Sequence, residues 1–318
     1  MTRYLVAGGC GFIGSHVTEA LLRLPQAEVV VYDNLSSGRT WHLDAVADDP
    51  RLTIVEDSLA DLDALTNSLS GCAQAFHFAA NPDTARAASD PAIDFWEGTY
   101  LTHNLVEACR VAGVGRITYA SGSGVYGDRS DRNADECFGP LEPVSTYGAS
   151  KLGCEALLSA YAHMFGISSS AFRFANVVGA RQTHGVTFDF VRKLLADPTA
   201  LVILGDGEQS KSYVHVDDVV AAMLLVARAG RPGFEVFNVG TDDYVTVKEI
   251  ADLVVGELGL DGVEYRYSGG ARGWKGDVPI VRFDTAKIRG LGWANSRTSR
   301  EALLASIRAN RLEARRNS

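Results

Sequence analysis

The chain of 318 residues is predicted to adopt an α/β fold, with a doubly wound parallel sheet and a smaller, interleaved α/β region. Short apolar runs alternate with amphipathic segments over residues 1–175, which is typical of parallel strands joined by crossover helices. A glycine-rich turn also follows the first apolar run directly. The alternation then loosens, so we expect a first domain over 1–175, a second, mainly substrate-binding domain over 176–318, and a strand at 235–239 that returns to the main sheet.

The elements of the first half follow in chain order. Apolar runs predict strands over 3–7, 28–32, 52–55, 75–79, 116–120 and 167–174. Helical periodicity predicts helices over 15–24, 60–69, 95–112 and 146–165. We interpret His77, inside an apolar strand, as a core residue and not as a catalyst.

The second half is predicted to contain shorter elements. Strands are expected over 201–204 and 235–239, and helices over 187–195, 214–227, 247–258 and 301–310. The segment 205–208 is a turn, and 268–276 is a loop that carries Arg272 and Lys275.

Composition excludes several classes of partner. The formal net charge is −9, whereas a nucleic-acid-binding face must be basic. No stretch approaches the ~18 apolar residues of a membrane span, and glycine interrupts the first apolar run too early for a signal peptide. Five scattered cysteines, never in CxxC spacing, predict the reduced thiols of a cytoplasmic protein and no metal site.

The glycine-rich turn predicts a dinucleotide site of Rossmann type. Strand, GxxGxxG turn, helix and strand follow one another, and Asp33 ends the second strand 19 residues after Gly14. The glycines let the backbone approach a pyrophosphate, and the helix N-terminus offers it free N–H groups. Asp33 would bind a ribose hydroxyl and repel a 2′-phosphate, which favours NAD over NADP. The turn's candidate cofactor residues are Gly8, Gly11, Phe12, Ile13 and Gly14.

Three further segments are expected to line this cofactor site. The first is a loop that could close over the adenosine, with Asn34, Ser36, Ser37 and Gly38. The second is Asp57 and Ser58, which could reach the adenine amine, cap the helix at 60–69, or do both. The third is the end of the fourth strand, where small residues leave room for a cofactor; its candidates are Phe78, Ala79 and Ala80.

Tyr147 and Lys151 are the candidate proton-transfer pair. Four residues apart on a helix, they lie on one face, one turn from each other. A phenol ionises near pH 10, and a nearby ammonium stabilises the phenolate and lowers that pKa. Such a pair can take a proton from a sugar hydroxyl.

Together these stretches resemble the extended short-chain dehydrogenase/reductase family, in particular its nucleotide-sugar epimerases of the UDP-galactose (UDP-glucose) 4-epimerase type. The matching stretches run nearly end to end: 8–14, 33–38, 77–81, 147–151, 173–179, 204–218 and 272–277. The resemblance implies that Tyr147 is the acid/base and that Lys151 holds the nicotinamide ribose. It also implies substrate contacts from Asn176, Thr187, Phe188, Lys211, Tyr213 and Arg272, with Lys211 and Arg272 at phosphates.

Two positions depart from the family pattern. Relatives usually carry Ser or Thr at the position of Gly122, so Ser121 or Ser123 is expected to supply the catalytic hydroxyl, with a slight preference for Ser121. If neither hydroxyl reaches the C4 oxygen of the sugar, Tyr147 must exchange the proton with that oxygen directly. Relatives also often carry Asn near position 98, where this chain has Gly98.

The expected reaction is NAD-dependent epimerisation at C4 of a nucleotide-sugar through a 4-keto sugar, most simply between UDP-glucose and UDP-galactose. The alternatives are UDP-glucuronate 4-epimerase, a nucleotide-sugar 4,6-dehydratase or decarboxylase, and a non-catalytic NAD-binding regulator. Relatives often pair two helices per subunit in a homodimer, and the candidates are the helices at 95–112 and 146–165. The base and the sugar of the substrate stay open.

Overall fold

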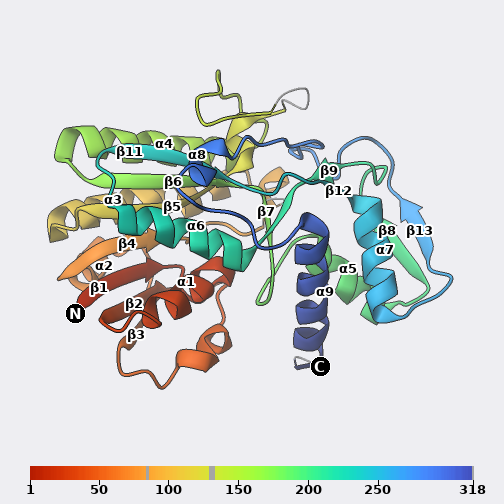
Figure 1. Cartoon of the computed structure of the whole chain (residues 1–318), viewed down its shortest axis with the longest axis horizontal. Coiled ribbons are helices and arrows are strands. Elements are labelled where there is room, and N and C mark those ends of the chain that lie inside the picture. The colour runs from red at the N-terminus through yellow and green to blue at the C-terminus, as the bar shows by residue number, and fades with distance from the viewer. Residues whose placement is uncertain (84–85, 129–132, 317–318) are drawn as a thin grey trace. The chain divides into compact units, whose positions relative to one another are not determined.

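The computed structural model describes residues 1–83, 86–128 and 133–316, and its chain divides into two compact units (Figure 1). Unit 1 comprises Met1–Gly122, Thr146–Arg173 and Val220–Phe237. Unit 2 comprises Ser123–Ser145, Phe174–Val219 and Asn238–Ser318. The boundary expected at 175 lies beside one observed division, but the segment 123–145 belongs to unit 2, and the segment 220–234, expected in the second domain, belongs to unit 1.

A seven-stranded parallel sheet forms the centre of unit 1, in the order β11-β6-β5-β4-β1-β2-β3. The returning strand, β11, joins its edge as predicted. The chain reverses its direction of winding between β1 and β4, and such a switch point leaves room for a ligand at the carboxyl ends of the strands. The strands are β1 Thr2–Ala7, β2 Ala27–Asp33, β3 Leu52–Glu56, β4 Cys72–His77, β5 Arg116–Gly122, β6 Ser168–Phe174 and β11 Phe234–Val239.

Helices cover both faces of this sheet. Apolar side chains of α2, α3 and α4 share one buried cluster with alternate residues of the strands, and Figure 1 shows α1 and α6 on the near face. The helices are α1 Phe12–Leu22, α2 Leu62–Ser68, α3 Leu101–Ala112, α4 Thr146–Phe165 and α6 Val216–Ala229. Short 3₁₀ turns are η1 Thr40–Val46, η2 Arg86–Ala88 and, in unit 2, η4 Ser123–Tyr126.

Two predicted helices begin differently from what periodicity suggested. The helix expected over 95–112 starts as a π-helix, η3 (Phe95–Tyr100), before α3 begins. The helix expected over 214–227 starts only at Val216, because Tyr213–His215 forms strand β10, which pairs in parallel with β7. Apolar periodicity does not distinguish these variants, since a buried strand end and a buried helix start are both apolar.

Unit 2 is built from short strand pairs and three longer helices. Strands β7, β9 and β8 pair with β10, β12 and β13 respectively. Helices α5, α7 and α9 share one apolar core, and Figure 1 shows these helices near one another. The elements are β7 Asn176–Val178, α5 Val186–Ala196, β8 Ala200–Ile203, β9 Ser210–Lys211, β10 Tyr213–His215, β12 Val245–Thr246, α7 Val247–Leu258, β13 Glu264–Tyr267, α8 Ala286–Arg289 and α9 Ser299–Arg316.

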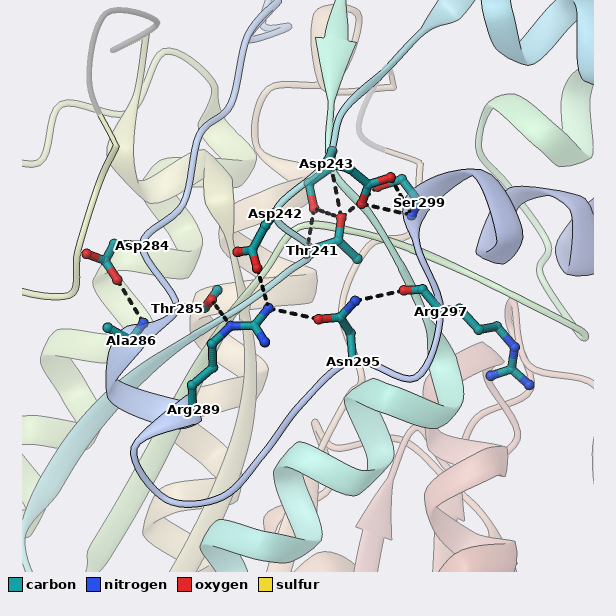
Figure 2. A network of polar contacts seen from close by, with 11 residues as sticks. Thr241, Asp242, Asp243, Asp284, Thr285, Ala286, Arg289, Asn295, Arg297 and Ser299 are labelled. Carbon is teal, nitrogen blue, oxygen red and sulfur yellow. Dashed lines mark hydrogen bonds and ion pairs between the residues drawn. The ribbon is translucent and has the colours of Figure 1, made fainter.

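A polar network fixes the start of α9 (Figure 2). The two carboxylate oxygens of Asp243 accept the Ser299 backbone N–H at 3.0 and 2.9 Å, and a negative charge at a helix N-terminus is favourable. The Ser299 hydroxyl in turn accepts the backbone N–H of Tyr213 at 2.9 Å. The network therefore ties strand β10 to the C-terminal helix. None of the described helices is both long and apolar enough to cross a bilayer.

Candidate active site

The glycine turn brings three backbone segments of unit 1 close together. A Cβ on Gly8 would stand 2.6 Å from the Ala79 nitrogen, and Gly8 has φ +77°. A Cβ on Gly14 would stand 2.1 Å from the Gly8 oxygen. Gly11 is the N-cap of α1 and makes no side-chain cap bond. The backbone N–H groups of the first turn of α1 therefore receive no hydrogen bond from a capping side chain and can bind an anion. This arrangement fits the pyrophosphate of a dinucleotide.

Asp33 lies beside this turn at the end of β2. Its carboxylate accepts the backbone N–H groups of Cys10 and Leu35, each at 2.9 Å. Burial raises the pKa of the Asp33 carboxyl, although these two bonds oppose the rise. A Cβ on Gly38 would stand 2.9 Å from Asp33 Oδ1, so the loop after β2 packs directly on the acid. The Asn34 side chain shapes that loop by accepting from the Ser36 N–H and hydroxyl.

The structure separates the two roles left open for Asp57 and Ser58. Helix α2 begins at Leu62, and its N-cap is Asp61, whose side chain accepts the Ala64 N–H at 2.9 Å. Asp57 instead accepts the N–H of Ser58 at 2.7 Å, and its own N–H donates to Asp33 O at 3.1 Å. The interpretation of these residues as the cap of α2 is therefore wrong. The other role, a contact to the adenine amine from a position beside Asp33, stays a prediction.

Tyr147 and Lys151 lie on one face of α4, as predicted. The Lys151 Nζ is 5.5 Å from the centre of the Tyr147 ring and 4.9 Å from that of Tyr119. Lys151 is 5% exposed and donates to the Ala120 carbonyl at 2.8 Å. The ammonium is thus fixed between two aromatic rings and the end of β5. Sequence reasoning missed Tyr119, because it looks like any buried strand residue.

The Ser121 hydroxyl is already engaged in the core of unit 1. It donates to Glu155 Oε1 at 2.6 Å, and Glu155 forms a buried ion pair with Arg173 at 2.7 Å. Ser121 is 5% exposed. The preference for Ser121 as the catalytic hydroxyl is therefore at odds with the structure. At Gly122, a Cβ would meet nothing within 4 Å, so the position itself has room for a side chain.

His77 is a buried residue of the sheet. It is 1% exposed, its Nε2 lies 2.9 Å from the Thr102 hydroxyl, and its ring contacts Tyr119. Burial and, secondarily, the charge of Lys151 lower the pKa of His77 to about 3. A neutral imidazole in this position supports the core interpretation.

Packing accounts for the departure at Gly98. A Cβ there would stand 2.3 Å from the hydroxyl of Ser150, the residue before Lys151. The neighbouring Thr99 hydroxyl lies 3.0 Å from the same Ser150 hydroxyl. A side chain at position 98 would displace the Ser150 hydroxyl, so glycine allows the close approach of η3 and α4 at this point.

In unit 2 the two expected phosphate-binding cations each meet a carboxylate. Lys211 Nζ lies 2.5 Å from Asp277 Oδ1, and Arg272 Nη2 lies 2.5 Å from Asp128 Oδ2. Arg272 also donates to the Asp277 carbonyl at 2.6 Å. Sequence reasoning missed both acids as partners, since they are 66 and 144 residues away from their cations.

The other predicted substrate residues divide into two groups. Asn176 is partly exposed and pairs with Tyr213 across β7 and β10, and Phe188 is partly exposed under the Arg192 guanidinium. Burial, with the nearby Asp277, raises the pKa of Tyr213. Tyr213 is 3% exposed and Thr187 is 0% exposed, and the Thr187 hydroxyl donates to Gln182 at 3.1 Å. The expectation that these two side chains line a nucleotide pocket does not agree with their burial.

No group of three or more His, Cys, Asp or Glu side chains in the described ranges could hold a metal ion. The residues that could hold a cofactor are instead the turn 8–14, Asp33 and the ends of β3 and β4, all in unit 1.

Comparisons with known proteins agree with this fold and with NAD as the cofactor. Residues 4–240 match the model of the NAD dependent epimerase/dehydratase family. The chain is 35% identical to a UDP-glucose 4-epimerase of Mycolicibacterium smegmatis, over 92% of this chain and 93% of that protein.

Two solved structures show the same fold. A UDP-glucose 4-epimerase of Thermotoga maritima with UDP-glucose superposes with a TM-score of 0.88 at 32% identity, covering 98% of this chain and 100% of that one. A dTDP-glucose 4,6-dehydratase of Streptomyces venezuelae with NAD bound gives a TM-score of 0.90 at 31% identity, covering 98% and 97%.

The close approach at Gly14 predicts the effect of adding one methyl group. In Gly14→Ala, the Cβ meets backbone that cannot move aside. Overpacking of this kind costs about 1–3 kcal/mol, so we expect roughly ten- to hundredfold weaker NAD binding, measured by calorimetric titration. Gly115→Ala, whose Cβ would meet nothing within 4 Å, is the matched control and should bind normally. Unchanged NAD affinity in Gly14→Ala would contradict the assignment of this turn.

Proposed function

Because the chain belongs to the NAD dependent epimerase/dehydratase family, we propose that it is a nucleotide-sugar 4-epimerase that interconverts UDP-glucose and UDP-galactose. One observation carries the proposal: α4 presents Tyr147 and Lys151 one turn apart, with the Lys151 Nζ 5.5 Å from the phenol ring. The epimerases named above support the choice of reaction and of a UDP-hexose.

In the proposed mechanism, NAD held by the turn 8–14, Asp33 and Lys151 would supply a reversible hydride acceptor beside C4 of the sugar. The Tyr147 phenolate removes the proton of the C4 hydroxyl as C4 is oxidised, which gives a 4-keto sugar. The hexose then turns about its phosphate linkage, so that C4 is reduced from its opposite face, and Tyr147 returns the proton. Lys151 holds the nicotinamide ribose and stabilises the phenolate. No cofactor is consumed, so tight NAD binding is expected.

The nucleotide must stay bound while the sugar turns. We assign the diphosphate to Lys211 and Arg272, which lie on β9 and on the loop after β13. Their carboxylate partners, Asp277 and Asp128, offset part of the charge. Lys211 supplies a compact point charge instead of the planar fork of an arginine. We assign the partly exposed Asn176 and Phe188 to the rest of the nucleotide-sugar.

Dehydration and decarboxylation are the nearest rival reactions. A 4,6-dehydratase needs an additional acid and base, and relatives with that activity carry Asp-Glu where this chain has Ser123 and Gly124. A decarboxylase typically keeps the Glu. Epimerisation of UDP-glucuronate needs only different contacts to the sugar, and Arg181 or His184 would be the candidates for its carboxylate. The substrate panel below separates these reactions.

Replacing Tyr147 with phenylalanine tests the proposed chemistry. The wild type is incubated with UDP-, dTDP- and GDP-sugars, including UDP-glucuronate, and new epimers are followed by NMR. We expect exchange between UDP-glucose and UDP-galactose, and a loss in Tyr147→Phe of roughly 10²–10⁴-fold in kcat, the contribution of a general acid–base group. Bound NAD should be retained. Undiminished turnover in this variant, or 4-keto-6-deoxy or decarboxylated products from the wild type, would overturn the proposal.

We assign the catalytic hydroxyl to Ser123, because Ser121 donates to Glu155. Ser123→Ala should lower kcat by roughly 10²-fold, as expected for loss of a proton-transfer group. Gly122→Ser in the same chain should recover most of that loss, because the space around position 122 is open and the family's usual hydroxyl is restored. Steady-state kinetics of the single and double variants measure both effects. An unaffected Ser123→Ala would show that Tyr147 transfers the proton directly.

We also propose a homodimer formed by η3, α3 and α4. Phe95 and Trp96 are 53% and 55% exposed on η3, and Met164 and Phe165 are 68% and 46% exposed at the end of α4. Exposed apolar patches of this kind often mark interfaces.

Sedimentation tests the dimer. The wild type should sediment as a dimer and Trp96→Asp as a folded monomer, because a charge in the apolar patch is costly to bury. Leu312→Asp, a change at a 64% exposed position of α9, is the control and should remain dimeric. A monomeric wild type at micromolar concentration would contradict this arrangement.

A cytoplasmic location completes the proposal. The five cysteines are free, and four of them are buried. Reduced thiols are typical of cytosolic proteins. Recovery of the protein outside the cytosolic fraction of its cells would argue against this location.

A further inference from the structure

We propose that the segment Asp94–Thr99, at the start of the π-helix η3, is a positioning element for α4, with Asp94 and Thr146 as its central pair. The inference rests on the proposed function, in which Tyr147 and Lys151 do the chemistry. The segment contacts α4 at the residue before each of them. It therefore sets where the phenol and the ammonium stand through its contacts to α4.

The first contact involves a buried carboxylate. Asp94 is 2% exposed, and its Oδ2 accepts the Thr146 hydroxyl at 2.7 Å. Its Oδ1 accepts the Asn81 side-chain N–H at 3.0 Å, and Asn81 is itself fixed by bonds to and from the Asp83 backbone. Thus a buried acidic side chain links the segment after β4 to the first residue of α4 through two hydrogen bonds.

The position of Thr146 explains what the bond can do. Thr146 is the first residue of α4 and Tyr147 the second. Helix ends fray, because their first N–H groups lack partners within the helix. A phenol on the first turn therefore needs an external constraint to stay in one place. The Asp94–Thr146 bond supplies it from the neighbouring helical segment.

The second contact lies one helical turn further along α4. The hydroxyl of Ser150, next to Lys151, lies 3.0 Å from that of Thr99. Gly98 makes this approach possible, since its Cβ would stand 2.3 Å from the Ser150 hydroxyl. Thr146 and Ser150 are four residues apart and so share a face of α4, beside the face of Tyr147 and Lys151. π-Helical turns are often found at functional sites. Here the segment 94–99 contacts one face of α4, and the adjacent face carries Tyr147 and Lys151.

Thr146→Val tests the first contact, because valine keeps the β-branched shape and removes only the hydroxyl. Loss of position by about 1 Å can cost 10²-fold in rate, so we expect kcat to fall roughly 10- to 100-fold with KM and bound NAD unchanged. Thr146→Ser, which keeps the hydroxyl, should retain wild-type kcat. Thr118→Val is the matched control, since Thr118 is also buried and accepts the Gln74 side chain at 2.7 Å. It should lose stability but not kcat.

Several results would overturn the positioning role. Wild-type kcat in Thr146→Val would do so, as would equal kcat losses in Thr146→Val and Thr118→Val. If the wild type converts no sugar, the proposed function fails, and the positioning role is read from amide hydrogen exchange instead. Exchange over residues 147–151 should then be faster in Thr146→Val than in the wild type or in Thr118→Val. Unchanged exchange there would reject the positioning role, whatever reaction the protein performs.

A pair of substitutions tests the second contact. Gly98→Ala should displace the Ser150 hydroxyl from Thr99 and lower kcat, because the new Cβ overlaps that hydroxyl. Ser150→Ala removes the same hydroxyl and leaves the Ser150 Cβ, at 3.4 Å, as the nearest side-chain atom. The double variant should therefore lose no more activity than Gly98→Ala alone, a non-additive result typical of residues in contact. Strictly additive losses, or no loss in Gly98→Ala, would contradict it.

Discussion

The close approach of backbone to backbone at the glycine turn is the constraint on which the rest of unit 1 depends. Gly8 lies against the Ala79 backbone, and Gly14 lies against the Gly8 carbonyl, with no space for a side chain at either position. This packing sets the start of α1 directly above the carboxyl ends of β1 and β4, where the sheet reverses its winding. Asp33 accepts an N–H from inside the same turn. The glycine turn and Asp33, the proposed ribose contact, are therefore joined by a direct hydrogen bond.

Helix α4 is constrained from three sides within unit 1. Glu155 pairs with Arg173 of β6 and accepts the Ser121 hydroxyl of β5. Lys151 donates to Ala120 of β5, and η3 holds the residues before Tyr147 and Lys151. Catalysis by proton transfer needs groups placed to within a fraction of an ångström. Here placement comes from buried polar contacts, which are directional, and not only from apolar packing, which tolerates sliding.

In unit 2, ion pairs fix the positions of two cationic side chains. Lys211 and Arg272, the proposed diphosphate contacts, are each held by a carboxylate, which orients their side chains. The acids also reduce the net positive charge around these two cations.

Local patterns in the sequence determined the elements of unit 1, the glycine turn with Asp33, and the pairing of Tyr147 with Lys151 on one helical face. These features depend on residues close in sequence, where periodicity and turn chemistry act directly. The tertiary structure alone decided the engagement of Ser121 with Glu155, the burial of Thr187 against Gln182, and the capping of α2 by Asp61. It also decided why position 98 holds glycine, and which carboxylates face Lys211 and Arg272. Each of these depends on atoms brought together from distant segments or on the exact residue at which a helix starts, and the pattern of a single stretch contains neither.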